Sequence, residues 1–453
     1  MKSSLLALIG CGCFAIAQLL ASNASAQAPV PSTDPVLYHE PWYVKPSGND
    51  SASGRSWTDA FATVERALLF VEPDGQIWVA GGTYTSVMPR LITKPLQLYG
   101  GFVGTETRTG QRPPPGPAAP QTIIQGHPGN RPAHVIAIGE IADTSQVVID
   151  RVVLKYGDGF TQGVDGGGIM APCVHLVLSD VTVQECSGYF YGGGITFGGG
   201  CSTYSWRRLS MKNCTIKQNF ADRYGGGLSV SVGFGEIVNT RFEANGCGYS
   251  GGGCHLMYQD PSHQVDFVGC VFAGNNCTAP YPMGAGGLSL ITLHDYTIPG
   301  NAELTNCTFS GNTVQYQPNG SAISVGQNSL CAIRNSIIWG NPGSPEVIGP
   351  LVLVSNSAGR STWCPAGNNN LLNTDPLFVS TADLDLQAGS PCIDRGRFAF
   401  LPSDILDVDW DGNTSEILPL DILRRPRTVD NPGVPNGVLD MGAYERPLSV
   451  GTP

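Results

Sequence analysis

Acids and histidines that could serve proton transfer gather in the middle of the chain. The members are His255, Asp260, His263 and Asp266, with Asp295 further along. A carboxylate and an imidazole held close to a substrate can act as general base and general acid. Spacing in the sequence does not make a pocket by itself, so the alternative is that these are polar loop residues.

A second group of residues could bind sugars. Tyrosines precede the glycine-rich stretches of the chain, at Tyr189, Tyr191, Tyr224, Tyr249, Tyr281 and Tyr316. A tyrosine ring offers an apolar face and a polar edge. We therefore consider Tyr191, Tyr224 and Tyr249 as a surface on which sugar rings stack. The alternative is that the tyrosine loops pack against themselves.

A third candidate is a calcium site. The stretch Asp407-Val408-Asp409-Trp410-Asp411-Gly412 has the alternating carboxylates that open a calcium-binding loop. Its twelfth position is Leu418, which departs from the glutamate of an EF-hand. We expect Asp407, Asp409 and Asp411 either to hold one Ca²⁺ or to form a solvated acidic turn. No other cofactor is indicated.

These candidates lie on or beside an internal repeat. A glycine triplet with a following residue recurs at 166–169, 192–195, 225–228 and 251–254, with looser copies at 284–288 and 320–323. A second motif, an apolar residue three positions before an asparagine, alternates with it. We call the apolar residues at this position of successive repeats the apolar column: Leu154, Val183, Ile216, Phe242, Phe272, Phe309 and Ile338. The steps average about 31 residues, which is within the range of solenoid repeats.

The repeat predicts stacked coils, because one such period cannot bury its own apolar face. The asparagine column reads Asn219, Asn245, Asn275, Asn312 and Asn341. Stacked amides can hydrogen-bond from coil to coil, and asparagine tolerates the left-handed backbone of a tight corner. Apolar and polar residues alternate after the triplets, as in strands with one buried face. Earlier strands are predicted at 76–80, 95–102, 122–125, 135–138 and 147–154.

The alternating Gly-Gly-x-Ile/Leu and Phe-x-x-Asn motifs resemble the repeats of polymorphic outer-membrane proteins. More broadly, they resemble the parallel β-helix repeats of the pectin-lyase-like superfamily. The likeness covers residues 150–341. It implies an all-β fold, a right-handed parallel β-helix over 42–345. Polysaccharide lyases of this fold use Asp-bound Ca²⁺ and an Arg or Lys base, and we find no matching constellation.

Residues 368–445 carry a second resemblance. The stretches 375–378, 389–394, 409–412 and 440–445 are similar to the core of the choice-of-anchor Q domain. This likeness implies a secreted or surface protein of bacteria, and the family has no assigned catalytic residues. We expect a C-terminal end of the β-helix followed by a cap over 346–453.

The N-terminal region predicts export and a capping helix. Residues 1–26 combine a charged start, an apolar run and a small-residue cleavage site, which is typical of a signal peptide. A lipobox-like stretch before Cys11 offers lipoprotein processing as the alternative. Residues 27–41 form a Pro-rich leader. A capping-box pattern at 56–59 and apolar residues at helical spacing predict a helix over 57–71 that closes the solenoid.

Cysteine usage agrees with export. Twelve cysteines follow the signal peptide, and an even number in an exported chain predicts disulfides. Cys247 and Cys277 each follow a column asparagine by two residues, so they are one candidate pair. Cys270 and Cys307 are another. The alternative is a ladder of buried thiols.

The composition excludes some classes of binding partner. The net charge of −11 and the absence of a Lys/Arg cluster argue against nucleic acid. Beyond the signal peptide, no run reaches the ~20 apolar residues of a membrane span. We expect a secreted or cell-surface scaffold, without catalysis, that binds polysaccharide or a cell-surface protein. The alternative is a polysaccharide lyase or glycoside hydrolase, and the oligomeric state stays undetermined.

Overall fold

The computed structural model describes residues 40–116, 118–141, 145–198, 207–231, 233–258, 263–278, 284–292, 300–315, 320–343, 345–429 and 438–447. The predicted signal peptide and nearly all of the leader lie outside these residues. So do Asp260, Tyr281, Asp295 and Tyr316.

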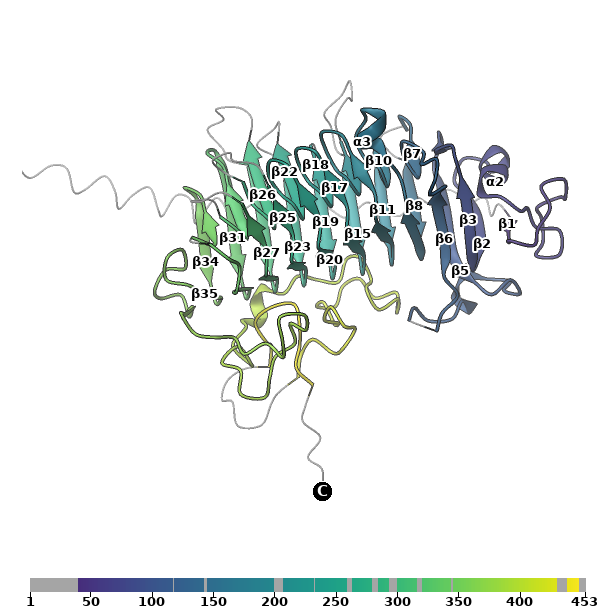
Figure 1. Ribbon diagram of the computed structural model, residues 1–453. Helices are drawn as coiled ribbons and strands as arrows, with labels where there is room; N and C mark the ends of the chain where they lie inside the picture. The colour runs from purple at the N-terminus through teal and green to yellow at the C-terminus, as the bar shows by residue number, and fades with distance from the viewer. Residues whose placement is uncertain are drawn as a thin grey trace, which may run out of the picture. The chain divides into compact units, whose positions relative to one another are not determined.

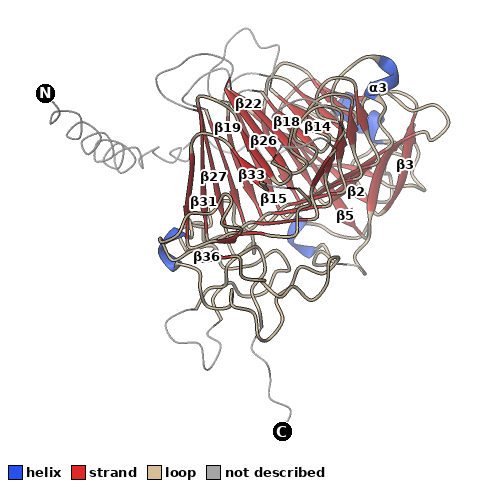
Figure 2. Cartoon of the chain, turned by 60° about the vertical axis from the view of Figure 1, so that its left-hand side comes forward, coloured by secondary structure: helices blue, strands red, loops and turns tan. Residues whose placement is uncertain are grey.

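Four parallel sheets make up the described fold (Figures 1 and 2). Sheet 1 contains β1 (Trp42–Val44), β2 (Gly75–Ala80), β5 (Leu96–Phe102), β8 (Gln146–Asp150), β11 (His175–Ser179), β15 (Arg208–Lys212), β19 (Phe234–Val238), β23 (Gln264–Val268), β27 (Gly300–Thr305), β31 (Ser329–Arg334) and β34 (Val352–Ser355). Sheet 2 contains β3 (Gly82–Ser86), β6 (Thr122–Gly126), β9 (Val152–Lys155), β12 (Thr182–Gln184), β16 (Thr215–Lys217), β20 (Arg241–Glu243), β24 (Val271–Ala273), β28 (Thr308–Ser310), β32 (Ile337–Ile338), β35 (Ala358–Gly359) and β36 (Leu371–Leu372). Sheet 3 contains β4 (Arg90–Ile92), β7 (Ile136–Ile138), β10 (Ile169–Ala171), β14 (Ile195–Phe197), β18 (Leu228–Val230), β22 (Cys254–Tyr258), β26 (Leu288–Thr292), β30 (Ile323–Val325) and β33 (Val347–Ile348). A short sheet contains β13 (Ser187–Gly188), β17 (Phe220–Ala221), β21 (Gly246–Cys247), β25 (Asn276–Cys277) and β29 (Thr313–Val314).

Each coil of the main repeat passes from a glycine triplet through sheet 3, sheet 1, sheet 2 and the short sheet. Neighbouring coils are in register, so Phe242 lies beside Phe272, which lies beside Phe309. Their rings stack with centroids 4.6 and 4.4 Å apart inside the core. Crossovers between parallel strands of one sheet are right-handed in nearly all proteins. The chain is therefore a right-handed parallel β-helix, and the predicted fold class is confirmed.

The asparagine column forms a continuous buried ladder, as the sequence predicts. Each amide donates to the side-chain oxygen of the next coil, from Asn219 at 3.1 Å through Asn245 at 3.0 Å and Asn275 at 2.9 Å to Asn312 at 2.8 Å. Each amide also donates to a backbone carbonyl of the preceding coil. Asn341 ends the run.

Glu346 terminates this ladder, a role that the sequence did not reveal. Its Oε1 accepts hydrogen bonds from the backbone N–H of Asn341 at 3.0 Å and from the amide of Asn341 at 3.3 Å. The side chain is fully buried, and burial raises the pKa of its carboxyl group. A carboxylate therefore supplies the acceptor that a further coil would otherwise provide.

A second column of residues turns the chain between sheets 1 and 2. Its members have positive φ angles: Arg151, Asp180, Asn213, Asn239, Gly269, Asn306, Asn335 and Asn356. The prediction of one strand over 147–154 is wrong for this reason. Arg151, with φ of 54°, divides that stretch into β8 and β9.

The N-terminal helix is shorter than expected. Helix α2 spans Val64–Phe70, and Thr63 caps it by accepting a hydrogen bond from the N–H of Arg66 at 3.2 Å. The capping-box hydrogen bond forms at Ser56, whose hydroxyl accepts from the N–H of Asp59, but only a turn follows. The predicted start at 57 is therefore wrong. A capping box favours a first turn, and a tertiary contact decides whether a helix continues from it.

The C-terminal region continues the stack to β36 and then leaves it. Beyond residue 375 the chain runs along the flank of the coils, beside the corner between sheets 1 and 2 (Figure 1). Asn306 donates to the carbonyls of Asp440 and Gly442 at 2.9 and 3.2 Å, and Asn239 donates to Leu420 at 3.1 Å. The segment thus packs on the side of the stack, which corrects the expectation of a cap that closes its end.

The four candidate disulfide cysteines are all reduced and buried. Cys247 and Cys277 are register partners in β21 and β25. Cys270 and Cys307 directly precede the register partners Val271 and Thr308 of β24 and β28. Parallel neighbours keep their Cβ atoms at about the 4.8 Å strand spacing, which exceeds the ~3.8 Å of a disulfide. The structure therefore agrees with the alternative prediction, in which these cysteines form a ladder of buried thiols. Cys173 is disulfide-bonded.

Candidate functional site

The predicted catalytic residues that the structure describes lie on two different sheets. His255 lies in β22 on sheet 3. Asp266 lies in β23 on sheet 1, and His263 directly precedes that strand. The ring of His255 is buried and stacks on Tyr224 with centroids 4.7 Å apart. Burial lowers the pKa of His255 to about 3, so the imidazole is neutral at ordinary pH. His255 and Asp266 thus lie on different sheets, and a catalytic role for the predicted cluster stays a prediction.

Asp266 instead belongs to a row of carboxylates on the outer face of sheet 1. Glu236, Asp266 and Glu303 are register partners on β19, β23 and β27. Burial and the charges of both neighbours raise the pKa of Asp266 to about 7, although Gln264 donates to both of its oxygens at 2.8 and 2.9 Å. The row therefore holds a carboxyl group that can carry a proton near neutral pH.

The ends of this row are paired with cations. Arg334 forms an ion pair with Glu303, and Arg208 lies 3.6 Å from Glu236. The sequence did not point to Glu236 and Glu303 as neighbours of Asp266, because they lie 30 and 37 residues away from it in the chain. The repeat register could have found them, since all three occupy the same place in successive coils.

The three candidate tyrosines largely pack on one another. Tyr224 stacks on Tyr191 with centroids 5.4 Å apart and planes at 16°, and it lies 5.5 Å from Tyr249. His255 covers a face of Tyr224 as well. These rings are half-buried. The structure therefore favours the alternative of self-packing for Tyr191 and Tyr224, whose faces are already occupied.

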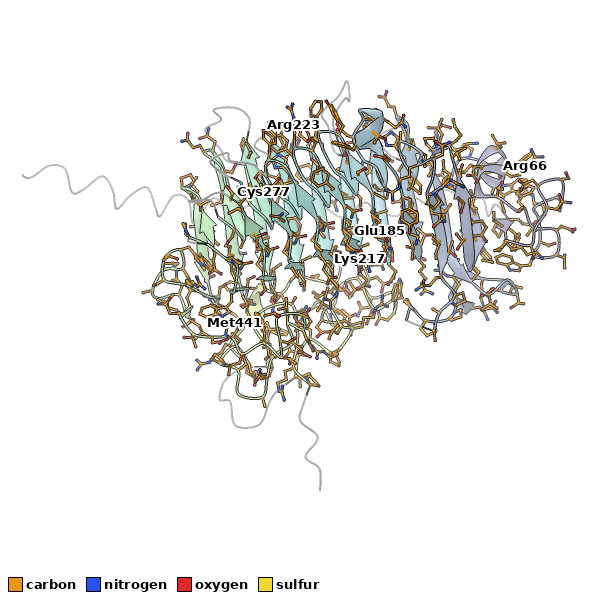
Figure 3. The ribbon with its side chains drawn as sticks, viewed as in Figure 1. Arg66, Glu185, Lys217, Arg223, Cys277 and Met441 are labelled. Atoms are coloured by element: carbon orange, nitrogen blue, oxygen red, sulfur yellow. The ribbon has the colours of Figure 1, made fainter. Side chains whose placement is uncertain are left out.

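A partly exposed patch adjoins Tyr191 and Tyr224 and includes Tyr249. We call it the aromatic patch and define it as Phe160, Tyr189, Phe190, Phe220, Arg223 and Tyr249. Phe160 and Phe220 are each 41% exposed, with ring centroids 6.2 Å apart. Phe160 also lies 6.3 Å from Tyr189. Arg223 projects from the edge of the stack (Figure 3), with its guanidinium carbon 4.2 Å from the ring centre of Phe190 and 5.5 Å from that of Tyr249.

Local structure fixes the position of Phe160 in this patch. Helix α3 (Gly159–Gln162) carries it, and Asp158 caps the helix by accepting from the N–H of Thr161 at 3.1 Å. The same carboxylate accepts from the hydroxyl of Ser187 in β13 at 2.8 Å. Phe220 lies in β17, which pairs with β13, and Asp158 pairs with Ser187 of β13 from the other side. The two exposed rings therefore stand on alternate coils, one on each side of the coil that contains β13.

The acidic loop gathers more carboxylates than the sequence indicated. Two groups share Asp409: one adds Asp404 and Asp407, and the other adds Asp411 and Glu416. Within each group, one oxygen of each residue lies within 4.8 Å of the others. Carboxylate oxygens are the ligands that Ca²⁺ prefers. The loop could hold one such ion, and calcium binding by Asp407, Asp409 and Asp411 stays a prediction.

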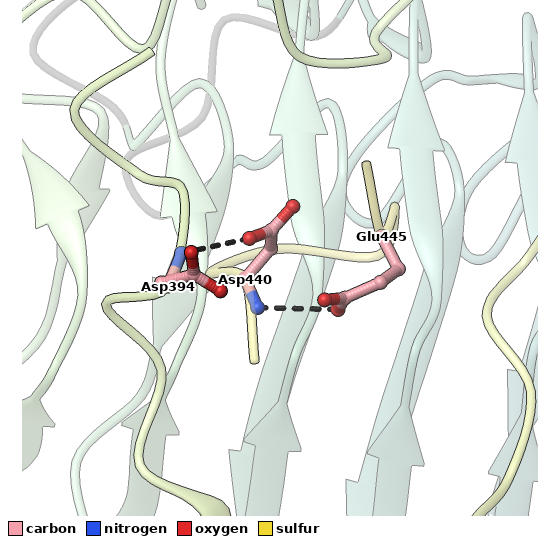
Figure 4. A group of neighbouring side chains, drawn as sticks. All are labelled: Asp394, Asp440 and Glu445. Atoms are coloured by element: carbon pink, nitrogen blue, oxygen red, sulfur yellow. Dashed lines mark hydrogen bonds between the residues drawn. The ribbon is translucent and has the colours of Figure 1, made fainter. Parts of the chain in front are cut away.

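A separate buried trio of carboxyl groups lies in the C-terminal segment: Asp394, Asp440 and Glu445 (Figure 4). Both oxygens of Asp440 accept backbone hydrogen bonds at 2.8 Å, from the N–H groups of Asp394 and Arg446. Glu445 accepts from the N–H of Asp440 at 3.1 Å. Burial, with the charge of Asp440, raises the pKa of Glu445 to about 9. At neutral pH Glu445 therefore keeps its proton.

The Glu445→Gln variant is expected to flatten the pH dependence of stability. A carboxyl group with a raised pKa binds its proton more tightly in the folded state, so the free energy of unfolding falls as pH rises from 4.5 to about 9. One such proton contributes at most ~1.4 kcal/mol per pH unit. Urea unfolding between pH 5 and pH 9 measures the slope. Asp383→Asn, at an exposed carboxylate, should keep the wild-type slope, and an unchanged slope in Glu445→Gln would contradict this prediction.

Comparison with known proteins adds likenesses of fold. No protein-family model and no curated protein matches the chain. The crystal structure of pectate lyase Pel9A is 14% identical over 90% of this chain and 96% of that one, with a TM-score of 0.47. XylC in complex with xylose is 9% identical over 90% and 99% of the two chains, with a TM-score of 0.37. Pectin methylesterase from Aspergillus niger is 14% identical over 73% and 83%, with a TM-score of 0.28.

The fold assignment rests on the four parallel sheets. The resemblances to polymorphic outer-membrane repeats and to the choice-of-anchor Q domain stay predictions, because no family model matches. Among the described residues, no helix is both long and apolar enough to span a membrane.

Proposed function

We propose that the chain is an exported, non-catalytic β-helix protein that binds glycan on the aromatic patch. The observation that supports this proposal is the pair of half-exposed rings, Phe160 and Phe220, which stand on alternate coils with centroids 6.2 Å apart, in the same patch as Arg223. Exposed apolar groups gathered at one place mark interaction sites. Sugar rings have apolar faces that stack on such rings and hydroxyl groups that the neighbouring charged side chains can bind.

A glycan fits this patch better than an apolar protein surface does. Charged groups border the rings: Arg223 covers Phe190, and Asp165 accepts hydrogen bonds from the N–H groups of Phe190 and Tyr191 at 2.8 and 2.9 Å. The rings recur along the coil axis, so an extended polysaccharide could run along this edge of the stack and contact more than one ring. Export itself follows from the signal-peptide prediction, and N-terminal sequencing of the mature protein tests it.

Substitution of both exposed phenylalanines tests the binding proposal. The double variant Phe160→Ala/Phe220→Ala should weaken retention on immobilised polysaccharides at least tenfold, because full burial of one phenylalanine side chain contributes about 1.5–3 kcal/mol and two rings that a sugar would partly cover are removed. Phe398→Ala removes a ring that is 44% exposed in the C-terminal segment and serves as the matched control. Affinity electrophoresis against a polysaccharide panel measures retention. Equal loss in both variants, or no retention of the wild type by any polysaccharide, would count against the proposal.

The carboxylate row supports a second candidate, a carbohydrate-active enzyme. Asp266, with its pKa near 7, could act as general acid, and Glu236 or Glu303 as base. Carboxylates on adjacent coils stand ~4.8 Å apart and those on alternate coils ~9.6 Å apart, close to the separations of retaining and inverting glycosidases. Turnover of a polysaccharide that is lost in Asp266→Asn and kept in Asp383→Asn would favour the enzyme.

A further inference from the structure

A pocket of about 390 Å³ lies at the corner between sheets 1 and 2. We call it the corner pocket. Its walls come from three separate parts of the chain: the loop that contains Pro113 and Gln121, the corner residues of three successive coils, and Arg424 of the C-terminal segment. The volume lies at the small end of the range of ligand pockets, ~300–1,000 Å³. Such a space suits one or two sugar units.

The pocket carries an excess of positive charge. Arg151 and Arg424 both line it, and Asp180 is the single acid among its lining residues. Arg424 is ion-paired with Asp180. The chain as a whole carries a net charge of −11, so this concentration of guanidinium groups is local. The two guanidinium groups would therefore attract an anionic group that binds between them.

Arg151 is held in place and has donor capacity to spare. Its Nη1 donates to the carbonyl of Pro113 at 2.9 Å, and its guanidinium lies 5.3 Å from the ring centre of Trp410. Its Nε is buried and makes no hydrogen bond. The nearby carboxylate of Asp150 lies 3.9 Å from Nε and is already paired with Arg112. Because Nε is buried, a ligand would meet the remaining N–H groups of the Arg151 guanidinium.

The rest of the lining offers groups that bind hydroxyls. Thr182, Thr215, Asn213 and Gln121 face the same space. Guanidinium groups bind carboxylates through paired hydrogen bonds, while hydroxyl, amide and carboxylate side chains bind alcohols. A ligand with one carboxylate and several hydroxyls uses both sets. A neutral sugar leaves the arginines unused, and a simple inorganic anion leaves the hydroxyl-binding groups unused.

From this arrangement we infer that the corner pocket binds a carboxylated sugar, with its carboxylate between Arg151 and Arg424. The inference is independent of the aromatic patch, which lies near the short sheet. Arg424 belongs to the C-terminal segment and Arg151 to the stack. A ligand that bridges them also ties the segment to the coils, so binding is coupled to docking of the segment.

Titration of the full mature chain with glucuronate, glucose and inorganic phosphate tests the inference. Calorimetry should show saturable binding of glucuronate that is at least tenfold tighter than that of glucose or phosphate. Arg151→Gln and Arg424→Gln should each weaken glucuronate binding about tenfold or more, because each removes charge-assisted hydrogen bonds to the carboxylate. Arg108→Gln, at an exposed arginine outside the pocket, should bind like the wild type.

The wild-type titration keeps the test independent of how the variants fold. Equal affinity for glucose, equal affinity for phosphate, or no binding of glucuronate would each overturn the inference. Trypsin cleavage after Arg424 gives a second readout, because bound glucuronate should protect this bond in the wild type. Retention on polysaccharides through Phe160 and Phe220 is unaffected by these outcomes, so failure here is distinguishable from failure of the proposed function.

Discussion

Replacing Asn275 by leucine is expected to lower the free energy of unfolding by about 3–5 kcal/mol, because four hydrogen bonds in the core lose a partner. The amide of Asn275 donates to the carbonyl of Phe242 at 2.8 Å and to Asn312 at 2.9 Å. Its oxygen accepts from the backbone and side chain of Asn245, each at 3.0 Å. Leucine has similar volume and offers none of these contacts, so buried polar groups on both neighbouring coils stay unsatisfied.

Equilibrium unfolding in urea measures this effect. The matched control is Asn276→Ala at the next residue, which is half-buried and accepts one hydrogen bond from Thr313 at 3.0 Å. Its cost should be about 0.5–1.5 kcal/mol, the usual contribution of one hydrogen bond. Similar losses for the two variants would show that the ladder contributes no more than a surface contact.

Replacing Asn306 by glycine is expected to release the C-terminal segment from the coils around it and to cost about 2–4 kcal/mol, because three hydrogen bonds are removed from buried groups. Two of them join the amide to the carbonyls of Asp440 and Gly442. The third is donated by Asn335 to the side-chain oxygen of Asn306 at 3.1 Å. Glycine keeps the backbone conformation at φ of 51°, as Gly269 does in the same column. The variant therefore isolates the amide.

Limited proteolysis of residues 375–447, together with urea unfolding, reads out this release. Asn369→Gly is the control, because Asn369 has φ of 56° and is exposed. This control should be as stable as the wild type or slightly more stable. Protection of the segment in Asn306→Gly at the wild-type level would mean that its apolar contacts alone hold it.

Those apolar contacts are substantial, which explains why the segment docks where it does. Val408 and Leu418 of the segment pack on Val238 and Val268, at the ends of β19 and β23. Met441 (Figure 3) packs with Ile337 of β32. Without the segment, these outward-facing valines at the ends of sheet 1 strands would expose apolar surface to solvent. The segment therefore covers an apolar surface that the repeat itself leaves open.

The candidate sites show how far sequence reasoning reaches. Asp409 and its neighbours could be recognised because their carboxylates are close in sequence. The pairing of Asp266 with Glu236 and Glu303 depends on register between coils about 30 residues apart. The corner pocket could not be predicted from the repeat at all. Arg151 and Arg424 are far apart in the chain and come together only when the C-terminal segment packs on the coils.

The repeat determined the fold by itself, because glycine triplets and a column of asparagines at one spacing leave stacked parallel coils as the way to bury the apolar faces. It also predicted the asparagine ladder, since every member occupies the same corner. Only the tertiary structure decided where the C-terminal segment lies, which tyrosines are covered, and which acids become neighbours. These depend on contacts between parts of the chain with no common period, and periodicity is the physical basis of what could be foreseen.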